Sequence, residues 1–450
     1  MKFLQTLTAL ILFSSIATAG TQVEPERALQ LLATQSQQFE KKVVQLTPNV
    51  FTAVGYHGAT TSMIVGEDGV IIVDTLMGPA SAAEALADFR KHSDKPVKAI
   101  IYTHSHGDHT GGAAAFMDQT EVEVYARDGF ANATGTEPAL RPLAMKRGTR
   151  QFGRKLPKHE QTNRGVAPAQ TMDGDRGKGH IPPTILVGAE SRALTIAGVA
   201  IEIHAAPGET DDAIFIWLPE EKVLFSGDNF YQSFPNLYAI RGTGYRDVMK
   251  WSKSVAKMAT FEPEHLVGGH TMPISGKAAA TSALQSYSDA IRYVYDQTVT
   301  GMNQGKSPDM IANEIQLVDS PPHLTEFYGS VAHASRAIYA GLLGWYDGNP
   351  TNLNRLHPRD EAKNIARLAG GTKQLIRNMK SSMENGDYQW ALQLADHLKW
   401  LEDGDRELAR ETKIAALRAL GAREYNAPNR NYYLSYANEL ESGELIDIWF

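Results

Sequence analysis

The chain has 450 residues, of which 42% are hydrophobic and 21% charged, a composition typical of a globular protein of two or three domains. Its 44 basic and 51 acidic side chains leave a formal charge of −7, which argues against general nucleic-acid binding. Cysteine is absent, which excludes disulfides, thiolate nucleophiles, iron–sulfur clusters and cysteine-ligated zinc. Any metal must therefore be held by His, Asp or Glu.

Residues 1–19 have the pattern of a secretory signal peptide. Lys2 precedes the apolar run 3–16, and small residues form a cleavage site that ends at Ala19. A membrane anchor is the alternative, but the run is shorter than the ~20 apolar residues that a spanning helix needs. No later segment is long and apolar enough to span a membrane, so we expect an exported protein, periplasmic or secreted.

Residues 20–295 are predicted to form a layered α/β domain. After a polar helical lead-in over 20–46, β-branched runs separated by glycine turns predict strands, and an amphipathic pattern predicts a helix over 81–92. Strands and helices then alternate to about residue 290, which is typical of α/β layers. The first predicted strands are 51–54, 61–65, 70–74 and 97–102.

The window 141–180 interrupts this alternation. It is rich in Gly, Pro and polar residues and holds ten Arg or Lys against three Asp or Glu. Such a run is usually a solvated, mobile loop. The alternative is an anion-attracting lid, because a long loop inside a compact domain is often functional.

From residue 296 to residue 450 the strands stop, and the pattern predicts an all-helical second domain. Ala and Leu recur on one face at helical spacing. The predicted helices cover 309–316, 329–343, 358–379, 388–401 and 405–420.

A cluster of ligand-type residues follows the predicted strand 97–102. His104, His106, Asp108 and His109 occupy six positions between that strand and a Gly-rich helix start. Imidazole and carboxylate are the ligands that suit a divalent metal such as zinc. Four of them exceed what one mononuclear site easily uses, so we expect a site for two metals. The alternative is an exposed polar loop that binds no metal.

This His-x-His-x-Asp-His motif is similar to the signature of the metallo-β-lactamase superfamily, whose fold is an αββα sandwich. Asp74 ends a strand where that superfamily places a carboxylate that supports a ligand. Asp228 and His270 match its bridging Asp and its last His ligand. Glu209, in Pro-Gly-Glu-Thr, replaces the usual third His.

The carboxylate at Glu209 makes the chain resemble the zinc-dependent alkylsulfatases over roughly residues 45–445. Segment 236–242 is similar to their sulfate-binding segment, and 151–157 to part of their active-site loop. Segments 329–350 and 429–434 are similar to their helical dimerisation domain. Two features depart from that family: its bridging carboxylate is commonly Glu, and many members carry a C-terminal sterol-carrier-like domain that we expect to be absent here.

The resemblance implies a binuclear centre. It assigns His104, His106 and Glu209 to one metal, Asp108, His109 and His270 to the other, and Asp228 to both. Two Zn²⁺ ions are expected, although the carboxylates leave iron or manganese open. Such a pair lowers the pKa of a shared water towards about 7 and makes hydroxide available. Asp108 and Asp228 are the expected catalytic carboxylates.

Four residues are expected to bind the substrate. A guanidinium fork suits sulfate oxygens bidentately, which favours Arg241 over a lysine. A surface salt bridge is the alternative for this arginine. Asn236 and Tyr238 belong to the same segment, and Lys277 follows His270 closely enough to add a point charge.

Three functions compete. The first is hydrolysis of an alkyl sulfate ester to alcohol and inorganic sulfate. The second keeps the metal site but acts on a β-lactam, thioester or phosphoester, because fold and metal do not fix the substrate. The third is a binding protein with a degenerate site. The complete ligand set argues against the third, and Glu209 with Arg241 favours the first.

A homodimer is expected, built by the helical tail. Residues 329–350 bring Ile338, Tyr339, Leu342, Leu343, Trp345 and Tyr346 into one short span. This is more apolar surface than a peripheral helix usually shows. Packing of the same residues onto the chain's own sandwich is the alternative.

Overall fold

The computed structural model describes residues 20–117, 122–130, 138–169, 174–188 and 190–443. The predicted signal peptide at residues 1–19 lies outside them. Within the described ranges, no helix is long and apolar enough to cross a membrane.

The first layer is a seven-stranded sheet in which the strands follow one another in chain order. The first four strands pair antiparallel, and the fourth to the seventh pair parallel. The strands are β1 Lys42–Thr47, β2 Val50–Val54, β3 Thr61–Val65, β4 Val70–Val73, β5 Val97–Ile101, β6 Glu123–Arg127 and β7 Ile185–Val187.

The second layer is a six-stranded sheet in the order β13-β12-β11-β10-β9-β8. Only β11 and β12 pair parallel within it. Its strands are β8 Arg192–Ile196, β9 Val199–Ala205, β10 Ile214–Leu218, β11 Val223–Phe225, β12 His265–Val267 and β13 Ile274–Ser275.

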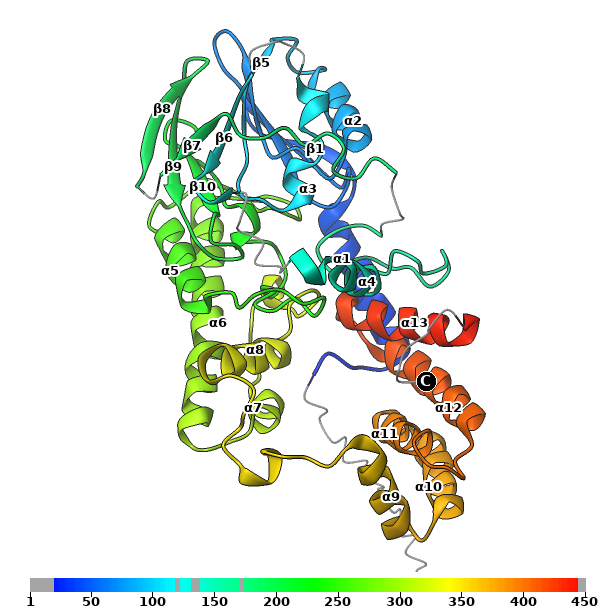
Figure 1. The fold of residues 1–450 in the computed structure, drawn as a ribbon. Helices are drawn as coiled ribbons and strands as arrows, with labels where there is room; N and C mark the ends of the chain where they lie inside the picture. Colours follow the sequence, from blue (N-terminus) through cyan, green and yellow to red (C-terminus); the bar gives the residue numbers. More distant parts are fainter. Residues whose placement is uncertain (1–19, 118–121, 131–137, 170–173, 189, 444–450) are drawn as a thin grey trace, which may run out of the picture.

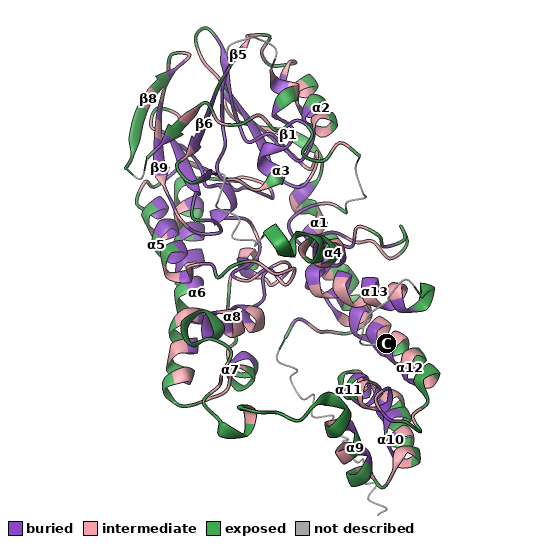
Figure 2. Ribbon diagram, viewed as in Figure 1, coloured by how far each residue is buried: buried purple, intermediate pink, exposed green. Residues whose placement is uncertain are grey.

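Alternating apolar side chains hold the two sheets together. In β4, Ile71 and Val73 point into the core between the sheets, whereas Val70 and Ile72 point to the opposite face. Helix α2 (Pro79–Phe89) covers that opposite face. β4 is accordingly buried along its whole length, and Figure 2 shows buried strands at the centre of the sandwich.

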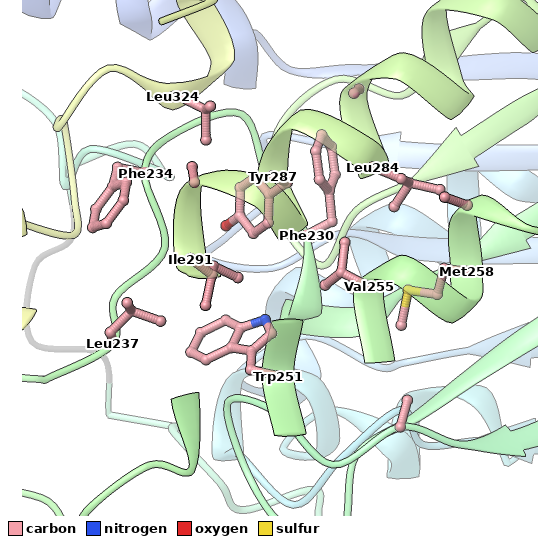
Figure 3. Packing of buried hydrophobic residues seen from close by; sticks show 14 of the residues in the cluster. Phe230, Phe234, Leu237, Trp251, Val255, Met258, Leu284, Tyr287, Ile291 and Leu324 are labelled. Carbon is pink, nitrogen blue, oxygen red and sulfur yellow. The ribbon is translucent and has the colours of Figure 1, made fainter. Parts of the chain in front are cut away.

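Two long helices cover the outer face of the second sheet. Trp251 of α5 (Val248–Ala259) and Tyr287 of α6 (Lys277–Asn303) are fully buried against it, together with Phe230 (Figure 3). The resulting helix–sheet–sheet–helix order confirms the predicted αββα sandwich.

The predicted division of the chain at residues 295 and 296 falls inside α6, which runs unbroken to Asn303. Helices α7 (Pro308–Glu314) and α8 (Val331–Leu343) follow. Val331 and Ile338 of α8 belong to the same core as α5 and α6. The core on the outer face of the second sheet therefore includes α8, which lies beyond the predicted division.

The remaining helices form a separate layer with its own apolar cores. One helix predicted over 358–379 is two, since Gly370 and Gly371 adopt φ values of 97° and 104° that end the first helix. The helices are α9 Pro358–Ala369, α10 Thr372–Glu384, α11 Tyr388–Leu398, α12 Arg406–Arg423 and α13 Ala427–Ser442.

Two segments differ from the sequence-based expectation. Residues 42–47 form β1 rather than the end of a helix, because Val43 and Leu46 pack on the two faces of the first sheet. Residues 141–151, expected as loop, form α4 (Arg141–Gln151). Figure 1 shows α4 between α1 (Pro25–Ser36) and α13, beside the edge of the sandwich.

Candidate metal centre

Ligand-type side chains gather where strands of both sheets end at one edge of the sandwich. The first sheet supplies its residues from the turn after β5 and from α3 (Gly107–Thr110). The second sheet supplies them from the loop before β10, a 3₁₀ turn after β11 and the segment after β12. In chain order they are His104, His106, Asp108, His109, Glu209, Asp228 and His270.

These seven residues form two groups. His104, His106, Glu209 and Asp228 place one ligand atom each within 4.8 Å of one another. Asp108, His109 and His270 do the same in the second group. The grouping is the one that the family resemblance implies.

Asp228 lies between the two groups. Its Oδ1 is 3.1 Å from Nε2 of His109 and 3.3 Å from Nε2 of His270. Its Oδ2 is 3.7 Å from Nε2 of His104. One carboxylate thus faces ligands of both groups, which is the position that a bridging residue requires.

The donor set fits a pair of divalent cations. Among the described residues, Nε2 of His109, Oε2 of Glu209 and Oδ1 of Asp228 are buried and have no hydrogen-bond partner. Unpaired buried polar atoms are costly, and a metal is the kind of partner that imidazole and carboxylate atoms accept together. Burial, followed by the charges of Arg241 and Arg246, lowers the pKa of His106 to about 3, which keeps its imidazole neutral as a ligand must be.

Asp74 fixes the orientation of the first-sheet ligands. Its carboxylate accepts hydrogen bonds from the backbone and hydroxyl of Thr103, both at 2.8 Å, and lies 2.7 Å from Nδ1 of His109. The φ of Asp74 is +56°, a conformation that costs energy for a non-glycine residue. A carboxylate on Nδ1 leaves Nε2 of His109 as the atom that can bind a metal.

Close packing also positions His270. Its Nδ1 lies 2.6 Å from the carbonyl oxygen of Gly58, so its Nε2 points to the centre. A Cβ at the preceding Gly269 would come within 2.0 Å of Asp228 Oδ1. Glycine at 269 therefore leaves the space that the central carboxylate occupies.

Arg246 is a residue that sequence reasoning missed. Its Nη1 lies 2.6 Å from Oε1 of Glu209 and donates to the carbonyl oxygen of Asn236 at 2.5 Å. Burial raises the pKa of Glu209 to about 8, in spite of the opposing charge of Arg246. The unusual carboxylate thus has one oxygen held by Arg246 and the other free to bind a metal.

A cavity of about 120 Å³ opens over the centre. Five of the seven ligand-type residues line it, together with Phe152, Tyr328 and four arginines. The arginines are Arg154, Arg164, Arg176 and Arg241. The first three come from the basic window 141–180, as the anion-attracting alternative for that window expects.

Arg241, which is predicted from the sequence to bind the substrate, lies beside the ligand groups. It lines the cavity, and its Nη1 is buried without a hydrogen-bond partner. Its backbone N–H donates to Oε1 of Gln151 at 2.9 Å. The guanidinium is therefore available to an anion beside the ligands.

The other three predicted substrate residues do not line this cavity. Asn236 is buried, and its backbone carbonyl oxygen accepts from Arg246, the residue that holds Glu209. Tyr238 is partly buried outside the lining. Lys277 corrects a sequence expectation: it begins α6 on the surface and pairs with Glu262 at 2.7 Å. Proximity in sequence to His270 did not bring it to the site, because β13 and a turn intervene.

Comparison with known proteins gives two family matches. The metallo-beta-lactamase superfamily matches residues 55–270, and alkyl sulfatase dimerisation matches residues 308–443. The first range contains all seven ligand-type residues. The second covers α7 to α13.

Curated relatives cover most of the chain. A linear primary-alkylsulfatase of Pseudomonas sp. (strain ATCC 19151) is 35% identical over 84% of this chain and 73% of its own length. An (R)-specific secondary-alkylsulfatase of Pseudomonas sp. is 30% identical over 89% of this chain, which spans 62% of that relative's length.

A solved structure agrees with both. The stereoselective inverting sec-alkylsulfatase Pisa1 from Pseudomonas sp. superposes with a TM-score of 0.84 at 28% identity, over 95% of this chain and 73% of its own. The shared length includes the sandwich and the helical region, not the sandwich alone. The chain therefore belongs to the alkylsulfatase family of the metallo-β-lactamase superfamily.

Proposed function

We propose that the protein hydrolyses sulfate esters of alcohols to the alcohol and inorganic sulfate. The observation that carries this proposal is Arg241, whose unpartnered buried nitrogen faces a cavity that both ligand groups line. A guanidinium fork matches sulfate oxygens. The alkylsulfatase relatives support the same reaction.

The metal centre in this proposal holds two Zn²⁺ ions. His104, His106 and Glu209 would hold one, Asp108, His109 and His270 would hold the other, and Asp228 faces both groups. Such ions supply Lewis acidity and make hydroxide available from water at neutral pH. Metal analysis of the purified protein distinguishes zinc from iron or manganese.

The side chains of this protein orient the reactants. Arg241 binds the sulfate oxygens and so directs the ester towards the ligand groups. Asp108 lines the cavity, with 23% of its side chain exposed, and its carboxylate can accept a hydrogen bond from a water there. Asp228 is buried between the two ligand groups, so the negative charge of its carboxylate lies close to both of them.

Sulfate release from a series of alkyl sulfates, compared with nitrocefin, a thioester and a phosphate monoester, tests the proposal. We expect sulfate release and at least about tenfold lower kcat/KM for the other classes. Turnover of nitrocefin, the thioester or the phosphate monoester, with no sulfate released from any alkyl sulfate, would overturn the proposal and favour a different metallohydrolase.

Export and dimerisation complete the proposal. Residues 1–19 support export, because they combine a basic start, a short apolar run and a small-residue cleavage site. The dimerisation match and the exposed apolar side chains at the end of α8 support a homodimer. Trp345 and Leu343 are 74% and 62% exposed in the single chain.

A further inference from the structure

The cavity contains more guanidinium groups than one sulfate ester requires. Arg241 Nη1 and Arg154 Nε are both buried and without a hydrogen-bond partner. A sulfate monoester carries one negative charge, and one guanidinium fork satisfies two of its oxygens. The second available guanidinium has no counterpart in such a substrate.

Phe152 brings these groups together. The Cζ atoms of Arg154, Arg241 and Arg164 lie 4.9, 5.7 and 5.8 Å from the centroid of its ring. The ring itself lines the cavity. Arg154 and Arg241 thus lie near the same ring, and both line the cavity over the ligand groups.

The local charge favours an added anion at Arg154. Burial, together with the charges of Arg176 and Arg164, lowers the pKa of Arg154 to about 9. Burying cations near one another is costly, and the charge of Asp108 offsets only part of that cost at Arg154. An anionic group at this position relieves that cost, so binding it is favoured more strongly than at a solvated arginine.

The size of the cavity limits what reaches Arg154. Its volume of about 120 Å³ is well below the roughly 300–1,000 Å³ of pockets that bury a drug-sized ligand. Its aliphatic lining consists of Met77, Val166 and Ala167. A long alkyl chain has to leave the cavity, whereas a short chain with a charged end can stay inside it.

We propose that the preferred substrate is a short sulfate ester carrying a second anionic group a few carbons from the ester, with Arg241 on the sulfate and Arg154 on the second anion. This inference rests on the proposed sulfate-ester hydrolysis and names its substrate class. A carboxylate and a second sulfate share the required chemistry.

The test compares butyl sulfate with 4-(sulfooxy)butanoate and butane-1,4-diyl disulfate. For the wild type, we expect kcat/KM to be at least about tenfold higher for one of the two dianions than for butyl sulfate, one charge-assisted pair being worth roughly that factor or more. The dianion with the higher value shows whether the second group is a carboxylate or a sulfate. In Arg154→Gln, the ratio of kcat/KM for the preferred dianion to kcat/KM for butyl sulfate should fall to about one.

Lys155→Gln is the matched control. It removes a positive charge from the neighbouring position, but Lys155 is exposed and lines a different cavity. The ratio should survive in this variant. If the ratio fell in Lys155→Gln as far as in Arg154→Gln, the effect would be a general electrostatic one, and the role of Arg154 would be overturned.

Inhibition of the wild type keeps the proposal testable if Arg154→Gln does not fold. The non-hydrolysable 4-sulfobutanoate should compete with butyl sulfate at least about tenfold more tightly than butane-1-sulfonate. Equal inhibition, or equal turnover of dianions and butyl sulfate, would overturn this inference and leave the proposed function intact. Absence of sulfate release from every ester would instead overturn the proposed function.

Discussion

Arg150 of α4 donates hydrogen bonds from Nε and Nη2 to Glu439 of α13, 289 positions further along the chain. Its Nε and Nη2 lie 3.0 and 2.6 Å from the carboxylate oxygens. Asn431, also in α13, donates to the carbonyl oxygen of Gln151 at 3.3 Å. The side chain of Gln151 in turn accepts from the backbone of Arg241. The C-terminal helix thus supports the wall of the cavity over the metal centre.

Glu439→Gln tests this support. The pair is largely buried, so loss of the charge-assisted bonds should lower the free energy of unfolding by about 2 kcal/mol. KM for alkyl sulfates should rise, while the metal content stays unchanged, because Arg241 loses support but the ligands do not. Urea unfolding and steady-state kinetics measure both. The control is Glu441→Gln, whose carboxylate is exposed and pairs with Arg418; an equal loss in this control would contradict the role of Glu439.

His106→Ala tests the assignment of the metal ligands. Removing one of four clustered ligand atoms should remove about one metal per chain and lower kcat/KM by about three orders of magnitude. Elemental analysis of the purified variant measures the first effect. His159→Ala is the control, since this histidine is 81% exposed and lies outside the cluster. Full metal content in His106→Ala would refute the assignment.

The sandwich was predictable because its signals are local. Strands such as β4 are short apolar runs bounded by turns, and both faces of the first sheet are covered, so every position is apolar. The strand β1 was not predictable, since its pattern of burial arises from pairing with β2. The helix α4 was missed for a similar reason, because its support comes from Glu439 in a distant helix.

The residues of the candidate site also fall into those that the sequence predicts and those that it does not. His104 to His109 form a compact motif, and Asp228 and His270 each follow a strand closely, so a family signature identifies them. Apart from Arg241, the arginines of the cavity carry no such signature. For Arg154, only the excess of basic residues over 141–180 indicated an anion-binding role. Arg246 lies outside that window, and nothing in the sequence indicated its contact with Glu209. Lys277 shows the converse, since closeness in sequence did not predict its place.

Arg241→Ala and Lys277→Ala compare two residues that are both predicted from the sequence to bind the substrate. Arg241 faces the cavity, so its truncation should lower kcat/KM for butyl sulfate by about two to three orders of magnitude at unchanged metal content. Lys277 pairs with Glu262 on the surface, and its truncation should change kcat/KM by less than about twofold. Steady-state kinetics and metal analysis of both variants measure these effects. Normal turnover by Arg241→Ala would remove the basis for the sulfate pocket.

Leu343→Asp tests the proposed homodimer. Leu343 ends α8 with its side chain 62% exposed, beside Trp345, so a charge there should disrupt an apolar contact between two copies. Sedimentation at micromolar concentration should show a dimer for the wild type and a monomer for the variant. Leu186→Asp is the control, because Leu186 is 52% exposed on the edge strand β7 of the sandwich. A monomeric wild type would contradict the proposal.

Glu424→Gln should change how stability depends on pH. Burial raises the pKa of Glu424 from 4.5 to about 7, although the Thr21 hydroxyl donates to its carboxylate; the nearby Glu326 raises it further. The folded protein therefore binds this proton more tightly than the unfolded chain, and the stability that Glu424 contributes is full below pH 4.5 and is lost as the pH rises through about 7. Because Gln is always neutral, the unfolding free energy of Glu424→Gln relative to wild type should increase by about 3 kcal/mol between pH 4.5 and pH 8. Urea unfolding at both pH values measures this, with Glu24→Gln, 80% exposed, as the control. A difference that does not change with pH would show that the pKa of Glu424 is the same in the folded protein as in the unfolded chain.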